Sequence, residues 1–218
     1  MKILRFLIPI FIIGALAIPF VIVVQSVGGL DYFSDSSVSA EDQIYTLFRI
    51  AGLEAFLILT FYILFWEFRR ILESLFPGIS IVRLYFMGWP FVFLFILTHP
   101  ILFALYNATV SQKISEGLMV FVPKFFQGTD EWIMNLGRLA IYGLFLTALA
   151  SLLRKKFVRW NLEKKIPILN YIIFILVVFH SQNIGTDASA VVFRSITLFA
   201  VGLVMIGIMY RAVARMKF

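Results

Sequence analysis

The chain has only two histidines, and both lie inside long apolar segments. His99 stands in the segment FILTHPILF, directly before Pro100, and His180 stands in VVFHSQN. Ionisable side chains are costly in an apolar environment, and those that occur there commonly mark a functional site. A neutral imidazole is also a good ligand for iron, copper or zinc. The two histidines are therefore candidate metal ligands.

The composition indicates that the apolar segments lie in a membrane. Of the 218 residues, 61% are apolar and 25 are phenylalanine, whereas ordinary soluble domains are about 45–50% apolar. The formal charge is +7, but the basic residues form short clusters between apolar runs, which is typical of membrane topology signals and not of a nucleic-acid-binding face. The chain has no cysteine, which excludes disulfides, thiolate metal sites, iron–sulfur clusters and covalently attached haem.

The apolar runs predict one all-α domain over residues 1–218, an integral membrane bundle of six spans. A span needs about 17–25 mostly apolar residues. The first run follows Lys2 and Arg5 and resembles a secretory signal peptide, but it is longer than the apolar part of such a peptide, and we expect it to be a span. The six expected spans are residues 3–24, 50–66, 84–106, 133–153, 166–181 and 191–210.

The basic residues predict the orientation of these spans in the cell membrane. With six spans, 14 of the 19 lysines and arginines fall on one side, and by the positive-inside rule that side is cytoplasmic and carries both termini. The long connection 107–132 then lies outside. Its segment EGLMVFVPKFF suits either a short amphipathic element along the outer interface or an ordered loop with apolar anchors.

This topology places the two histidines at the same depth. His99 lies 16 residues after Arg83, and His180 lies 15 residues after Lys165. The helical rise puts them ~24 Å and ~22 Å along two spans that run in the same direction. In a hydrocarbon core of roughly 30 Å, both imidazoles are therefore in the outer third.

Two interpretations of this arrangement stay open. Imidazoles from two parallel helices at one depth suit a planar cofactor held between them, as in bis-histidine haem, which carries electrons because the protein fills both axial positions. Alternatively, each histidine hydrogen-bonds a neighbouring helix. A two-histidine zinc or copper site is less favoured, because Glu54 is the only acidic residue well inside the outer half of a span.

Four successive segments carry a resemblance to a known family. RIAGLEAFLILTFYILFWEFRRI has a glycine near its start and ends in paired arginines, and RLYFMGWPFVFLFILTHPILFALY is an aromatic-rich helix with a histidine. GRLAIYGLFLTALASLLRKKFVRW ends in small and basic residues, and ILNYIIFILVVFHSQ is an Asn-Tyr helix with a terminal histidine. In this order they resemble the ferric reductase-like transmembrane domain family, which includes ferric reductases, the membrane domains of NADPH oxidases and the haem-binding subunit of the bacterial periplasmic methionine sulfoxide reductase system. The segments run from about Arg49 to His180, and the family-like region extends over about 49–210.

The resemblance implies one haem b near the outer face, with His99 and His180 as the axial ligands of its iron. Family members can hold a second, inner haem between histidines about thirteen or fourteen residues earlier in the same helices. Here Phe86 and Pro167 stand thirteen residues before the two histidines, and neither can ligate iron. The sequence therefore resembles a one-haem member with only the outer, extracytoplasmic site.

The function implied by the resemblance is the transfer of single electrons toward the outer face of the membrane. The acceptor would be a metal chelate, a quinone or an extracytoplasmic redox partner. Because the chain has no Gly-rich nucleotide fingerprint and ends soon after the sixth span, we expect the donor to be a quinol or a separate reductase protein with its own flavin.

Arg138 and Arg194 are candidate partners of the haem propionates. They begin the fourth and sixth spans on the outer side, where cationic side chains can pair with carboxylates. Snorkelling of these arginines toward lipid headgroups is the alternative. Ser181, Gln182 and Asn183 are further candidate donors, and the alternative is that they cap the end of the helix.

Two rival functions stay open at this point. One is a haem-free membrane scaffold or small permease that kept the fold and lost the cofactor. The other is a quinol-handling subunit of an oxidoreductase, so the sequence leaves open whether the chain belongs to an enzyme. The expected partners are the lipid bilayer and the redox proteins or quinol named above, without nucleic acid.

Overall fold

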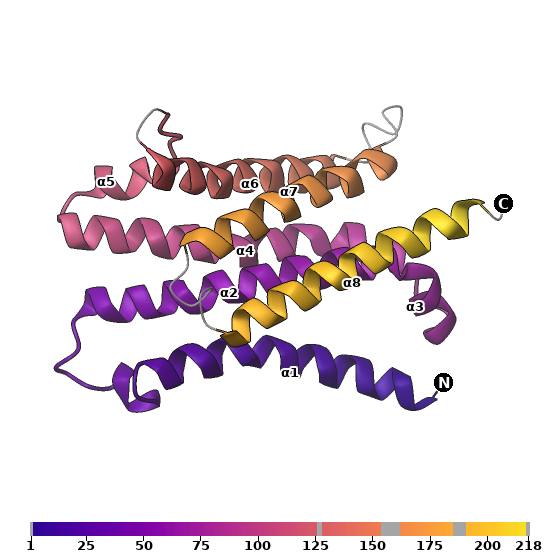
Figure 1. Cartoon of the computed structure of the whole chain (residues 1–218), viewed down its shortest axis with the longest axis horizontal. Helices are drawn as coiled ribbons and strands as arrows, with labels where there is room; N and C mark the ends of the chain where they lie inside the picture. The colour runs from indigo at the N-terminus through magenta and orange to yellow at the C-terminus, as the bar shows by residue number, and fades with distance from the viewer. Residues whose placement is uncertain (1, 126–127, 154–161, 185–190, 217–218) are drawn as a thin grey trace.

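The computed structural model of the protein describes residues 2–125, 128–153, 162–184 and 191–216, and these form helices and loops without strands. The basic residues within 154–161, which contribute to the predicted topology, lie outside the described residues. The helices of the described parts are α1 (Lys2–Ser26), the short 3₁₀ helix η1 (Leu30–Phe33), α2 (Ala40–Glu67), α3 (Arg69–Leu75), α4 (Ile81–Ser111), α5 (Ile114–Met119), α6 (Thr129–Leu152), α7 (Leu162–Ile184) and α8 (Val191–Met216) (Figure 1).

Four of these helices contain segments that are long and apolar enough to cross a membrane. Large apolar side chains such as Phe95, Leu198 and Phe199 are exposed on the outside of the bundle, as expected of a surface that faces lipid. The protein is therefore a multi-pass helical membrane protein, as predicted, whereas the count of six spans and the cytoplasmic termini stay predictions. The four segments are Ala40–Glu67, Ile81–Ser111, Thr129–Ala150 and Val191–Arg211, and shorter apolar stretches are Ile12–Ser26 and Ile168–Ile184.

Serine caps fix where two of the long helices begin. The side chain of Ser39 accepts a hydrogen bond from the backbone N–H of Asp42 (3.1 Å) at the start of α2, and Ser80 accepts one from Arg83 (3.3 Å) at the start of α4. Such caps satisfy N–H groups that the first turn leaves unpaired. Because the cap lies in a polar stretch, α2 begins at Ala40 and not at residue 50, where its apolar part was predicted to start.

The long helices form two pairs that pack together. α2 packs along α4, α6 packs along α7, and contacts of α4 with α6 and of α2 with α7 join the pairs. α1 and α8 pack against α2, and α8 crosses the bundle obliquely in Figure 1. The largest fully buried apolar side chains are Phe56, Leu59, Ile63, Trp89, Ile173 and Phe193.

The connection after α4, which the sequence places on the outer side, folds back onto the same helix. Gly117 of α5 is buried against α4, where a Cβ would lie 2.5 Å from the carbonyl oxygen of Ala104 and 3.0 Å from the Cβ of Ala108. Ile114, at the start of this short helix, is exposed. The connection also brings Val120 to the cavity described next.

Candidate functional site

A cavity of about 300 Å³ lies between the pair α2/α4 and the pair α6/α7. Its wall consists mainly of apolar side chains, such as Leu53, Phe56 and Ile96, and α8 contributes Phe193. Apolar pockets of roughly 300–1,000 Å³ with a few convergent polar groups are typical of ligand sites. The cationic and imidazole side chains that line this one are Arg49, His99, Arg138 and His180.

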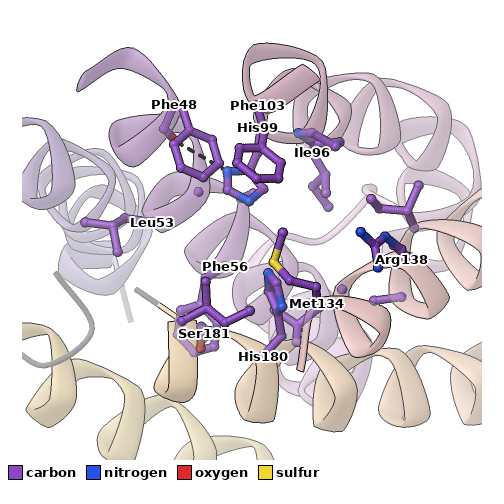
Figure 2. Close-up of a pocket in the computed structure, with 18 of the residues that line it drawn as sticks. Phe48, Leu53, Phe56, Ile96, His99, Phe103, Met134, Arg138, His180 and Ser181 are labelled. Atoms are coloured by element: carbon purple, nitrogen blue, oxygen red, sulfur yellow. Dashed lines mark hydrogen bonds between the residues drawn. The ribbon is translucent and has the colours of Figure 1, made fainter. Parts of the chain in front are cut away.

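The two histidines reach the cavity from different helix pairs. His99 projects from α4 and His180 from α7, and Figure 2 shows their rings directed toward the same space. The structure thus brings together the two side chains that the sequence analysis placed at one depth. Both rings reach one apolar cavity, and their depth in the membrane stays a prediction.

A backbone carbonyl orients each imidazole. Nδ1 of His99 lies 3.2 Å from the carbonyl oxygen of Phe48 on α2, and Nδ1 of His180 lies 3.0 Å from that of Ile133 on α6. A carbonyl oxygen can only accept a hydrogen bond, so Nδ1 carries the proton in both rings. Nε2 then keeps its lone pair, and neither Nε2 atom has a hydrogen-bond partner within the described parts of the chain.

Two further side chains shape the space around the rings. The ring of Phe48 stacks on that of His99, with centroids 4.6 Å apart and planes inclined by 15°. Met134 lines the cavity, and in Figure 2 its thioether lies beside His180. A methionine side chain is flexible and adapts to irregular space. Sequence reasoning missed Met134 because nothing in the sequence pattern separates it from the other apolar residues of its span.

Arg138 lines the cavity but is already held by the outer connection and by its own helix. Its Nε donates to the carbonyl oxygen of Val120 (2.8 Å), and its Nη1 donates to Glu131 (2.8 Å) and to the side-chain oxygen of Asn135 (2.7 Å). The side chain is only 6% exposed. Its charge is therefore paired with Glu131, while its Nη2 makes no hydrogen bond to a described residue.

Arg194 does not join this site. It lies in the first turn of α8 with an exposed side chain, away from the residues that line the cavity. Arg49, which the sequence analysis did not select, lines the cavity instead. Its Nη2 donates to the hydroxyl of Ser26 (3.0 Å), and its guanidinium lies 6.0 Å from the ring centroid of Tyr45. The sequence feature that could have identified Arg49 is its position one turn before Gly52, near the start of the second apolar run.

Of the three polar residues after His180, only Ser181 lines the cavity in the described structure. Its hydroxyl donates to the carbonyl oxygen of Val178 (3.1 Å) in its own helix. Asn183 is exposed, and its amide donates to the carbonyl oxygen of Phe179 (2.7 Å). Both hydrogen bonds lie within α7, so they support a role of Ser181 and Asn183 at the C-terminal end of this helix.

The inner position of the family pattern on α4, Phe86, lies in a densely filled part of the bundle. Phe86 is buried and packs edge-on against Tyr85, with ring centroids 5.4 Å apart. Tyr62 stacks on Tyr85 and on Trp89, at 4.2 Å and 4.7 Å. Pro167 lies in α7, with its side chain outside the described residues. Phe86 thus acts as a core side chain.

The chain matches no protein-family model, no curated protein and no solved structure. The family likeness consequently rests on the order of the four quoted segments and stays a resemblance.

Proposed function

We propose that the protein binds one haem b in the cavity, with His99 and His180 as axial ligands, and passes single electrons toward the outer face of the membrane. The observation that carries the proposal is the distance of each Nδ1 atom from a backbone carbonyl oxygen, 3.2 Å in His99 and 3.0 Å in His180. Both Nδ1 atoms are occupied by backbone carbonyls, so both Nε2 lone pairs remain for a ligand in the cavity. Metal-ligating histidines almost always use their second ring nitrogen in this way.

The other cavity residues fit the same group. The apolar wall suits a hydrophobic macrocycle, and Arg49 and Arg138 supply cationic side chains at the cavity for its carboxylates. Arg194 has no place in this ligand set, because its side chain is exposed and outside the cavity lining. The set therefore keeps both predicted histidines and one of the two predicted arginines.

When bound, haem supplies reversible one-electron exchange at its iron. The chain's own part is to hold two neutral imidazoles toward one space and to keep water away with an apolar wall. Two protein ligands leave no coordination position for oxygen or a substrate, which suits electron transfer. A quinol or a separate reductase would be the donor, and a metal chelate, a quinone or an extracytoplasmic protein the acceptor.

We also propose that α1 and α7 cross the membrane, so that there are six spans with both termini cytoplasmic. α1 has 25 residues and α7 has 23, which gives lengths of about 37 Å and 34 Å at the helical rise. Either length exceeds a hydrocarbon core of roughly 30 Å. The start of α1 and the end of α8 lie at the same end of the bundle in Figure 1, which supports an even number of spans.

A reduced-minus-oxidised visible spectrum of the purified protein tests the haem proposal. The wild type is expected to give a low-spin b-type signal with about one haem per chain, and His99→Ala and His180→Ala are each expected to lose it. Arg194→Ala is the matched control and keeps the signal. A colourless wild type, expressed and purified with haem supplied, contradicts the proposal.

A second candidate function, a haem-free scaffold or small permease, is supported by the same hydrogen bonds. His99 on α4 bonds α2, and His180 on α7 bonds α6, as structural histidines between helices would do. A purely structural role gives no binding partner to the Nε2 atoms, whereas a haem iron would bind both. We therefore favour the haem protein. The spectrum above separates the two functions.

A further inference from the structure

Each histidine ring lies directly against a glycine of the neighbouring helix. A Cβ placed on Gly52 of α2 would lie 2.7 Å from Nδ1 and 2.8 Å from Cε1 of His99. A Cβ placed on Gly137 of α6 would lie 2.7 Å from Cε1 and 2.9 Å from both nitrogens of His180. Real Cβ atoms do not approach other atoms this closely, so neither ring could keep its position beside an alanine.

The two glycines also have the same relation to the carbonyls that orient the rings. Gly52 comes four residues after Phe48, and Gly137 comes four residues after Ile133. In an α-helix every Cα–Cβ bond tilts toward the N-terminus, so a side chain covers the turn before its own Cα. A side chain at either glycine would therefore cover the carbonyl that its histidine uses.

We propose that Gly52 and Gly137 are positioning residues that expose these carbonyls and thereby fix both imidazoles with Nδ1 protonated and Nε2 toward the cavity. The same unit, a carbonyl and a glycine four residues later, occurs once in each helix pair and serves one histidine each time. The use of Nε2 as a metal ligand rests on the proposed function. The orientation and protonation of the rings do not, so they can be tested without haem.

Close packing alone does not account for this pattern. Gly143 is also packed tightly in the α6–α7 interface, where a Cβ would lie 2.8 Å from Cγ1 of Ile173. That contact involves only an aliphatic side chain, and Gly143 does not line the described cavity. Gly143 is thus a matched control, because an alanine there disturbs the same helix pair without touching a histidine.

The first experiment is NMR of the haem-free protein carrying histidine labelled with ¹⁵N in its ring. With only two histidines in the chain, His99→Ala and His180→Ala assign the signals. In the wild type both rings are expected to show a protonated Nδ1 and an unprotonated Nε2. Gly52→Ala is expected to change only the His99 signals, Gly137→Ala only those of His180, and Gly143→Ala neither.

The second experiment follows the haem-loaded protein by visible spectroscopy with carbon monoxide as a probe. Gly52→Ala and Gly137→Ala are each expected to convert most of the low-spin signal to a high-spin form that binds carbon monoxide, because one ligand is displaced. Gly143→Ala is expected to stay low-spin even if its thermal unfolding midpoint falls. A merely structural role for Gly52 and Gly137 would lower the midpoint and leave the spin state unchanged.

The outcomes separate this inference from the proposed function. If the wild type binds no haem but the ring signals shift as expected, the positioning role stands and the haem proposal falls. If the alanine variants keep wild-type ring signals and spin state, the positioning role is wrong. Should Gly52→Ala fail to fold, adding His99→Ala removes the opposing ring and is expected to restore folding. A glycine needed for another reason would not be rescued, and that result also overturns the inference.

Discussion

The half of the bundle that holds the cavity, which we propose to be the outer half, and the opposite, inner half use the same helices but fill them differently. On α2, Gly52, Leu59 and Trp66 follow one another at seven-residue spacing, which places them on roughly the same side of the helix. Gly52 and Leu59 line the cavity, whereas Trp66 is buried in the inner half and packs against Tyr85 at 4.7 Å between ring centroids. Along this face of α2, the glycine lies at the cavity and the tryptophan lies in the filled half.

The two halves also differ in how their polar groups are paired. In the outer half a backbone carbonyl pairs with Nδ1 of each imidazole. In the inner half Glu67 is only 2% exposed, and one of its carboxylate oxygens is tied to two other helices. Its Oε1 accepts from Nη1 of Arg211 (3.1 Å) and from the hydroxyl of Tyr171. This cluster joins α2, α7 and α8 in a fixed arrangement. The Glu67 cluster thus connects three helices in the inner half, whereas the proposed ligand site lies in the half that holds the cavity.

The largest expected effect comes from breaking the inner cluster with Glu67→Ala. Removing one partner of a buried ion pair leaves the other charge unpaired and costs about 3–5 kcal/mol. Thermal or denaturant unfolding in detergent measures the loss. Glu54→Ala is the control, since Glu54 lies in the same helix, half-buried, without an ion pair to a described residue.

A double variant sharpens this test. Replacing both members of a buried pair by apolar residues is often nearly neutral, so Glu67→Ala combined with Arg211→Met is expected to be more stable than Glu67→Ala alone. A double variant that is no more stable than the single one would show that Arg211 is not the group left unpaired.

A smaller effect is expected from Arg138→Ala at the outer half. The variant loses hydrogen bonds from a charged group to Val120, Glu131 and Asn135, and each hydrogen bond of this kind contributes about 1.5–3 kcal/mol. We expect a total loss near the size of one such bond, because water can reach part of the outer connection, together with faster proteolysis there. Arg194→Ala, with its exposed side chain, is expected to change stability by no more than about 0.5 kcal/mol. Equal effects of the two variants would contradict the difference in burial.

The variant Phe86→His tests whether the inner half is too densely filled to hold a haem. It places an imidazole at the inner position of the family pattern. We expect no second haem, because Tyr62, Tyr85 and Trp89 fill the adjoining space and Pro167 offers no second ligand. Burying an imidazole there without a partner is expected to cost about 1–3 kcal/mol. Haem content per chain, compared with that of the wild type, is the measurement, and a doubled content would overturn the account of a filled inner half.

The sequence predicted what depends on composition and spacing along each helix. The apolar runs predicted the helical bundle, and counting from the basic clusters placed His99 and His180 at one depth. What it did not predict depends on how each helix is rotated about its axis. Arg49 and Arg194 both stand near the start of an apolar run, yet only Arg49 faces the cavity. That rotation is set by packing between helices, which periodicity in one segment does not determine.

The contacts of charged residues at span ends were also not predictable from the sequence. Arg211 is one of the 14 basic residues that the sequence places on the cytoplasmic side. In the structure its side chain pairs with buried Glu67, and its guanidinium lies 5.4 Å from the ring centroid of Trp66. Gly52 and Gly137 were visible as glycines inside apolar runs. Their role follows only from the histidine that each one faces, and that residue lies on another helix.

The smallest expected effect lies outside both halves, in the connection between α1 and α2. The backbone N–H of Ser37 donates to Oδ1 of Asp35 (2.8 Å) and holds the pKa of that exposed carboxyl below its ordinary value. A lowered pKa in the folded state adds stability that is present above the unfolded pKa, near 4, and is lost as the pH falls through the folded pKa. Asp35→Asn is therefore expected to reduce slightly the fall in unfolding midpoint between about pH 5 and pH 3. Midpoints of the two proteins across this range measure the effect, and identical pH profiles would show that the acid sensitivity of the protein arises elsewhere, in groups of the bundle itself.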